Sequence, residues 1–150
     1  MNVEAGGTAE ELATAQRALR ARWVDFRGAL DRRDDAAYRM AFQDFATHLR
    51  RWMTAEERIL VAALARAPDV MRDAPRELKV EIVQIRELTR FLLEQFASLS
   101  PLADILGLVD NLDRRMTAHE DRLISEYFPG AVVALTAEDW TALREAAPAD

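Results

Sequence analysis

Residues 112–129, LDRRMTAHEDRLISEYFP, repeat much of an earlier stretch, residues 49–60, LRRWMTAEERIL. In both stretches apolar residues recur in steps of three and four, which predicts an amphipathic helix. The first stretch places Glu56 and Glu57 where this spacing points inward. The second places His119 and Glu120 there, so the repeat predicts a helical bundle with a polar half-site in each of two helices. With a shift of 63 residues (112 − 49), identical residues stand at Leu49 and Leu112, Arg51 and Arg114, Met53 and Met116, Thr54 and Thr117, Ala55 and Ala118, Glu57 and Glu120, and Leu60 and Leu123.

The same spacing continues along the chain and predicts four long helices and a short fifth one. Pro68 ends the second helix because proline cannot continue it, and Pro75 suits the first turn of the third. Residues 68–75 are therefore the longest predicted connection. The predicted helices cover residues 8–31, 35–66, 75–99, 101–127 and 136–143, with N-caps at Thr8, Asp34 or Asp35, Ser100 and Thr136.

Four helices of roughly 24 to 32 residues with short links predict an all-α, antiparallel up-down-up-down four-helix bundle with a short C-terminal helix. The 150 residues form one predicted domain, in which residues 1–7 are a loose lead-in. The inner face of the third helix is expected to reach Leu99, and that of the fourth to include Leu108 and Arg115. The second and fourth helices then run parallel across a diagonal of the bundle. Glu56 should therefore meet the pair His119 and Glu120.

The composition excludes several classes of function. A net charge of −6 disfavours binding to nucleic acid, and the absence of cysteine excludes disulfides and thiolate metal sites. No apolar run approaches the roughly 20 residues that span a membrane, and the N-terminus lacks the pattern of a signal peptide. We therefore expect a soluble cytoplasmic protein. No phosphate-binding glycine loop, HExxH helix or Ser/His/Asp series indicates an enzyme.

The two repeated stretches resemble the hemerythrin-like, His-His-Glu cation-binding domains. The resemblance lies in L-x-x-W-x-x-x-E-E-x-x-L at residues 49–60 and L-x-x-R-x-x-x-H-E-x-x-L at residues 112–123. Phe128-Pro129 and the ending LTAEDW at residues 135–140 are also similar, and the likeness covers roughly residues 8–146. It implies a helical bundle that holds two iron atoms through histidines and two bridging carboxylates, for oxygen binding, sensing or iron handling.

Carried over to this chain, the bridging carboxylates would fall on Glu56 and Glu120, and two ligand histidines on Trp52 and Arg115. Neither indole nor guanidinium can replace imidazole as a ligand. The chain has only two histidines, His48 and His119, so most of the family's ligands are missing. The resemblance therefore implies a degenerate member without a cofactor: a non-enzymatic binding or regulatory module for an unknown small ligand or protein partner.

The alternative is a metal-binding protein in which Glu56, His119 and Glu120 hold a single divalent ion of iron, manganese or zinc. The sequence leaves the oligomeric state open.

Buried carboxylates must be paired, protonated or bound to metal. We expect Arg115 to bridge Glu56 and Glu120; the alternative is that Arg115 points outward and Glu56 is hydrated. His119 should point inward with a raised pKa, while His48 should be a histidine of the surface or of the core boundary. Trp52, Trp23, Met53 and Met116 are expected to fill the space that a cofactor would occupy.

Overall fold

The computed structural model describes residues 6–68 and 72–149, and within these ranges the chain is helical without any strand. Most of the predicted lead-in and the middle of the predicted 68–75 connection lie outside the described residues. No helix in the described ranges is both long and apolar enough to cross a membrane. The elements are α1 (Ala9–Asp31), α2 (Asp35–Ala55), η2 (Glu56–Leu60), α3 (Val61–Arg66), α4 (Ala74–Ala97), α5 (Leu102–Arg122), η3 (Leu123–Tyr127), α6 (Phe128–Val132) and α7 (Ala137–Ala146).

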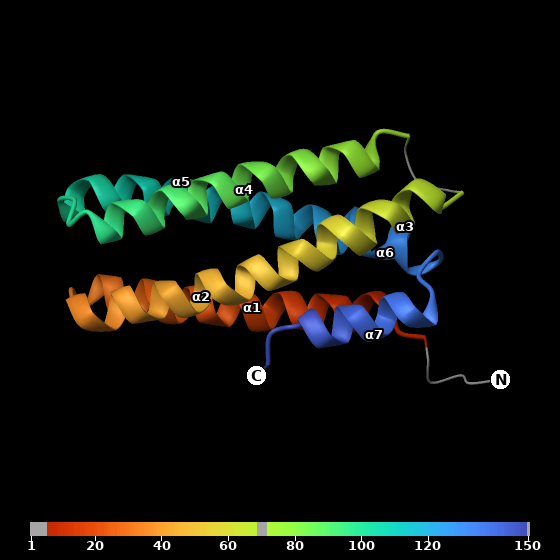
Figure 1. Cartoon of the computed structure of the whole chain (residues 1–150), viewed down its shortest axis with the longest axis horizontal. Coiled ribbons are helices and arrows are strands. Elements are labelled where there is room, and N and C mark those ends of the chain that lie inside the picture. The colour runs from red at the N-terminus through yellow and green to blue at the C-terminus, as the bar shows by residue number, and fades with distance from the viewer. Residues whose placement is uncertain (1–5, 69–71, 150) are drawn as a thin grey trace.

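The long helices lie side by side along the long axis of the molecule (Figure 1). α2 folds back along α1, α5 folds back along α4, and α2 also packs against α4. η2 and η3 are π-helical turns that continue α2 and α5 without a break. The short helix α7 packs on α2, and its Trp140 is buried, as is Phe128 in α6.

The sequence correctly predicts most of these helices. Thr8 and Asp34 cap α1 and α2 through their side chains, and Thr136 forms a complete capping box with Asp139 at the start of α7. Pro75 lies in the first turn of α4, where its missing N–H costs nothing.

The helix pair α1 and α2–η2 and the helix pair α4 and α5–η3 repeat each other. The repeat extends beyond residues 49–60 and 112–123, where the sequence shows it. Six buried positions of α1 recur as six buried positions of α4 with a shift of 66 residues (78 − 12). Six in α2 and η2 recur in α5 and η3 with a shift of 63 (105 − 42). The pairs are Leu12/Leu78, Gln16/Ile82, Leu19/Ile85, Trp23/Thr89, Phe26/Leu92 and Leu30/Phe96, then Phe42/Ile105, Ala46/Val109, Leu49/Leu112, Met53/Met116, Glu56/His119 and Leu60/Leu123.

The turn after each first helix is also repeated. Arg33 and Leu99 are the non-glycine residues with positive φ, 59° and 57°, among the described residues. Each turn closes with a backbone hydrogen bond across the helix end, from Asp34 to Ala29 (3.2 Å) and from Ser100 to Gln95 (3.3 Å). This left-handed ending usually carries glycine.

The predicted end of the third helix is wrong because the chain turns at Leu99 with positive φ. α4 stops at Ala97, and Leu99 is 77% exposed rather than on the inner face. Ser100 does not cap α5, because its hydroxyl donates to Gln95 Oε1 (2.6 Å) and the N-cap position is Pro101. Because this turn contains no glycine, helical spacing alone does not show where the helix ends.

The predicted inner face of the fourth helix is partly wrong. Leu108 is only half-buried and Arg115 is exposed, whereas Val109 and Met116 are buried. The observed face therefore runs through residues 105, 109, 112, 116, 119 and 123 in steps of four, three, four, three and four. Steps of three and four are both helical, so the predicted face and the observed one share residues 105, 112, 119 and 123.

The predicted end near residues 127–130 is also wrong. Phe128 N–H bonds to the Leu123 carbonyl across the π turn, and the helical path continues through Pro129 to Val132. Pro129 lies in the first turn of α6, where a missing N–H is tolerated.

Leu99→Gly should raise the free energy of unfolding by up to about 1 kcal/mol, because glycine adopts positive φ without the steric cost of a side chain. Ala97→Gly, two residues earlier in the last helical turn, should lower it by about 1 kcal/mol. Urea unfolding of both variants gives the comparison. A loss of stability in Leu99→Gly equal to that in Ala97→Gly would contradict the assignment of this turn.

Candidate functional site

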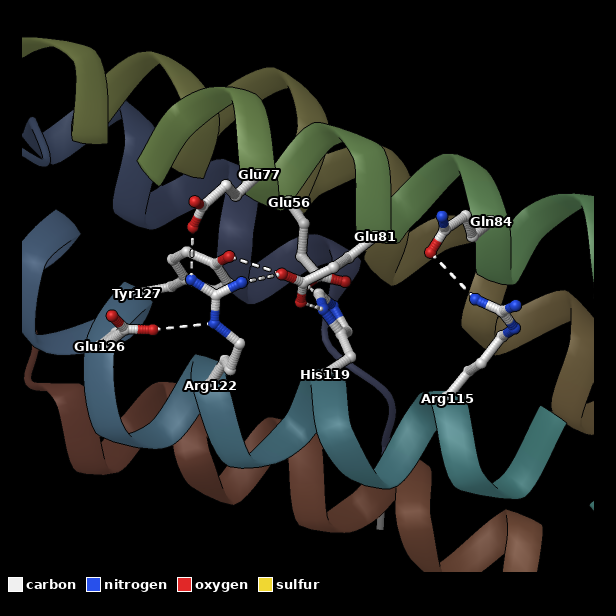
Figure 2. A network of polar contacts seen from close by, with 9 residues as sticks. All are labelled: Glu56, Glu77, Glu81, Gln84, Arg115, His119, Arg122, Glu126 and Tyr127. Carbon is white, nitrogen blue, oxygen red and sulfur yellow. Dashed lines mark hydrogen bonds and ion pairs between the residues drawn. The ribbon is translucent and has the colours of Figure 1, made fainter. Parts of the chain in front are cut away.

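His119 lies at the centre of the molecule with one carboxylate on each side of its ring. Its Nε2 is 2.9 Å from Glu56 Oε1, and its Nδ1 is 2.8 Å from Glu81 Oε1 (Figure 2). The side chains of His119 and Glu56 are only 3% and 1% exposed. The repeat predicted that Glu56 would meet both His119 and Glu120. Glu56 contacts His119, at equivalent positions of α2–η2 and α5, whereas Glu120 bonds to Gln16 and Arg20 instead.

A shell of polar groups holds the second carboxylate in place. Tyr127 donates its hydroxyl hydrogen to Glu81 Oε2 (2.6 Å), and Arg122 donates to the same oxygen. The Arg122 guanidinium also contacts Glu77 (2.6 Å) and Glu126 (2.8 Å), and it lies over the Tyr127 ring (Figure 2). We call these residues, with Glu56 and His119, the His119 network; it joins η2, α4, α5 and η3.

Burial alone would lower the pKa of His119, because a charged ring is poorly solvated inside a protein. The charge of Glu56 and the hydrogen bonds with Glu56 and Glu81 outweigh this and raise the pKa of His119 from 6.5 to about 9. The predicted rise is therefore confirmed. At neutral pH the ring is an imidazolium, and both nitrogens donate hydrogen bonds to carboxylates.

The same contacts shift the pKa values of the neighbouring groups. Partial burial acts to raise the pKa of Glu81, but the hydrogen bonds from His119 and Tyr127 lower it below its usual value. Burial and the hydrogen bond to Glu81 raise the pKa of Tyr127 well above its usual value. Tyr127 thus stays neutral as a donor and Glu81 stays charged as an acceptor.

The predicted role of Arg115 is wrong. Its side chain is exposed and donates to Gln84 Oε1 (3.0 Å), pointing away from Glu56 (Figure 2). The charge on Glu56 is balanced by His119 instead. Met116 rather than Arg115 belongs to the buried face of α5. The guanidinium of Arg115, one residue earlier, therefore points away from the core.

Trp52 and Glu120 belong to a second polar cluster on the other side of the core. Trp52 Nε1 donates to Gln16 Oε1 (3.0 Å), and Gln16 Nε2 is 3.4 Å from Glu120 Oε2. Arg20 donates from Nε to the same Glu120 oxygen (3.2 Å). His48 is half-buried, with its Nε2 3.5 Å from Asp44, which agrees with its predicted place at the boundary of the core.

Arg20 and Arg86 occupy equivalent positions of α1 and α4 and make equivalent contacts. Arg20 bonds Thr117 Oγ1 (3.1 Å) as well as Glu120, and Arg86 bonds Thr54 Oγ1 (3.2 Å) as well as Glu57. The identical T-x-x-E residues of the repeated stretch are therefore each held by an arginine from the other helix pair.

The residues that the family resemblance aligns with metal ligands do not fit a pair of iron atoms. Trp52 and Arg115 offer no lone pair, and each is a hydrogen-bond donor to glutamine. In the described ranges, no three side chains of His, Asp or Glu are placed to hold one metal ion.

Glu56, His119 and Glu120 do line one small cavity, with Gln16 and Arg20 also in its wall. The space in this cavity is about 10 Å³, near the lower limit for a single water molecule. The side chains themselves therefore fill the centre of the molecule, with Trp23, Met53 and Met116 buried around it.

The sequence did not reveal Glu81, Tyr127 or Arg122 as members of the site. Glu81 comes from α4, and only the position of that helix opposite α5 brings it to His119. One signal was present: a buried imidazolium has two N–H donors, and Glu56 can satisfy only one of them in this geometry.

His119→Ala should lower the free energy of unfolding by about 3–5 kcal/mol, because it leaves two partly or fully buried carboxylates without their cation. Arg115→Ala, one turn away on the same helix, should change it by no more than about 0.5 kcal/mol. Denaturant unfolding of both variants at pH 7 measures this. A larger loss in Arg115→Ala than in His119→Ala would contradict the assignment.

Stability should also depend on pH through His119. The folded pKa of about 9 lies above the unfolded value of 6.5, so its stabilising effect is complete below pH 6.5 and disappears as the pH rises through 9. Chemical unfolding at a series of pH values should show this loss in the parent chain and in His48→Gln. The loss should be absent in His119→Gln, and an equal loss in that variant would assign the effect elsewhere.

No protein-family model, curated protein or solved structure matches this chain. The likeness of residues 49–60 and 112–123 to hemerythrin-like domains therefore rests on sequence motifs. The chemistry of the site rests on the contacts of Glu56, His119 and Glu81.

Proposed function

We propose that the chain is a hemerythrin-like, antiparallel up-down-up-down four-helix bundle in which the His119 network stands where relatives hold metal. In this proposal the protein is not an enzyme and acts as a binding or regulatory module. The support is the repeated E-E and H-E motifs, together with a polar centre formed by equivalent positions of α2–η2 and α5.

The observation that carries the proposal is the position of the His119 ring between Glu56 and Glu81. An imidazolium with both nitrogens protonated has no lone pair for a metal ion. Its positive charge also supplies the attraction that a bound cation would give to buried carboxylates. The network thus neutralises its own charges and leaves no buried carboxylate in need of an ion.

The burial of His119 and Glu56 supports a non-enzymatic role. Catalytic groups must touch substrate, yet the side chains of His119 and Glu56 are almost fully buried. The cavity that Glu56 lines is near the minimum for one water molecule. A second pocket, which His119 and Glu81 line between α4 and α5, holds about 250 Å³, whereas ligand sites are usually about 300–1,000 Å³.

The competing candidate is the single divalent ion held by Glu56, His119 and Glu120, which line the same small cavity. Binding would require His119 to lose a proton and to give up its hydrogen bond with Glu56. It would also compete with Arg20 for Glu120. Both changes oppose the contacts that Glu56, His119 and Glu120 make in the structure.

Elemental analysis of protein purified without chelator or nickel resin separates the two. The proposal predicts less than about 0.1 equivalent of iron, manganese or zinc, and no change in thermal stability when these ions are added. His119→Gln is the matched comparison. Stoichiometric metal in the parent chain that is lost in His119→Gln would overturn the proposal in favour of the single-ion site.

A further inference from the structure

A groove of about 300 Å³ lies between α2 and α4, away from the His119 ring. Three of its lining residues are the arginines Arg50, Arg86 and Arg90, and among the described residues none of the lining is acidic. Leu49 and Leu93 give it apolar walls. A concentration of positive charge is unusual here, because the chain as a whole carries a net charge of −6. We call this feature the α2–α4 groove.

The repeat of the two helix pairs provides a reference for this groove within the same molecule. The equivalent place between α5 and α1 is filled. Trp23, which corresponds to Thr89 (23 + 66), lies there and donates its Nε1 hydrogen to Asp113 (2.8 Å). Arg20, which corresponds to Arg86, donates to the same Asp113 oxygen (3.1 Å). Indole and carboxylate together occupy the space and neutralise the arginine.

In the α2–α4 groove both of these groups are replaced. Thr89 stands at the Trp23 position and lines the groove with a much smaller side chain. Arg50 stands at the Asp113 position (50 + 63), so a positive charge replaces a negative one. Arg90 adds a further charge where α1 has Val24.

The positive charges of the groove are only partly balanced. Arg86 is held by Glu57 and Thr54, which fixes its guanidinium at one side of the groove. Within residues 6–68 and 72–149, neither Arg50 nor Arg90 forms an ion pair. Guanidinium groups bind carboxylates through two parallel hydrogen bonds, so the groove favours a bound carboxylate. Between α5 and α1, the side chain of Asp113 supplies the equivalent carboxylate.

We propose that the α2–α4 groove binds a small organic carboxylate with a flat apolar body about the size of an indole. The carboxylate lies among the three arginines, in the place that corresponds to the Asp113 carboxylate. The apolar body lies on Thr89 between Leu49 and Leu93, in the place that corresponds to the Trp23 ring. The proposal goes beyond the suggested module function and does not depend on whether the His119 site binds metal.

The size of the groove selects a small molecule rather than a protein segment. Its volume is at the lower end of the range for small-molecule sites and suits an aromatic ring with a short acid chain. Three arginines without a lining carboxylate select against neutral and cationic compounds. The apolar walls select against small inorganic anions, which gain nothing from them.

The test uses the whole chain and indole-3-propionate as the probe, with calorimetry for affinity and amide NMR shifts for location. We expect a dissociation constant of about 1 mM or tighter at low salt, weakening as salt is added. The shifts should centre on Thr54 and Thr89. The neutral indole-3-propionamide and the ring-free propionate should each bind at least about tenfold more weakly.

Variants that restore the arrangement on the other side of the molecule provide the strongest control. Arg50→Asp places a carboxylate as in Asp113, and Thr89→Trp places an indole as in Trp23. Each should weaken binding of the probe about tenfold or more. Arg50→Gln, an exposed and conservative change, keeps the test valid if a larger substitution destabilises the fold. Arg114→Gln, at an exposed arginine of α5, should bind like the parent chain.

The proposal is overturned if the parent chain shows no binding at 10 mM probe, about tenfold above the weakest expected constant. Equal affinity for the acid and its amide would overturn it as well. So would binding that is unchanged in Arg50→Gln and Arg50→Asp, or amide shifts that centre on residues outside the groove.

Discussion

The structure depends on the contact of two carboxylates, Glu56 and Glu81, with the imidazole of His119 inside the helical bundle. An isolated buried charge costs several kcal/mol or more, so Glu56 is stable at 1% exposure only with a cation in contact. His119 is that cation, and Glu81 takes its second N–H. Tyr127 and Arg122 then satisfy the remaining oxygen of Glu81. These contacts link η2, α4, α5 and η3 and so hold four helical elements in one arrangement.

The repeat of the two helix pairs explains where this centre lies. Glu56 and His119 occupy equivalent positions, so an axis relating the pairs passes close to their contact. Arg20 and Arg86 reach across in opposite directions to the T-x-x-E residues of the opposite pair. The two pairs differ chemically where the repeat is broken. Histidine stands in place of glutamate at the centre, and Thr89 and Arg50 stand in place of the tryptophan and aspartate on the other side.

Much of this could be predicted from the sequence, because helix spacing and caps are local. The starts of α1, α2 and α7 and the contact between Glu56 and His119 follow from residue periodicity and from the 63-residue repeat. The buried face of α5 could not be predicted in this way. Between Leu112 and His119 a helix can place either residue 115 or residue 116 inward, and only packing against the neighbouring helices selects Met116. Glu81 and the α2–α4 groove depend on which helix lies opposite, which one sequence does not state.

At neutral pH we expect His119 to be an imidazolium held between the carboxylates of Glu56 and Glu81. Nitrogen NMR of the His119 ring during a pH titration tests it most directly. We predict that both ring nitrogens carry hydrogen at pH 7.5 and that the ring titrates with a pKa of about 9. A ring that titrates at or below its ordinary value of 6.5, or one nitrogen that carries no hydrogen at pH 7.5, would contradict the account.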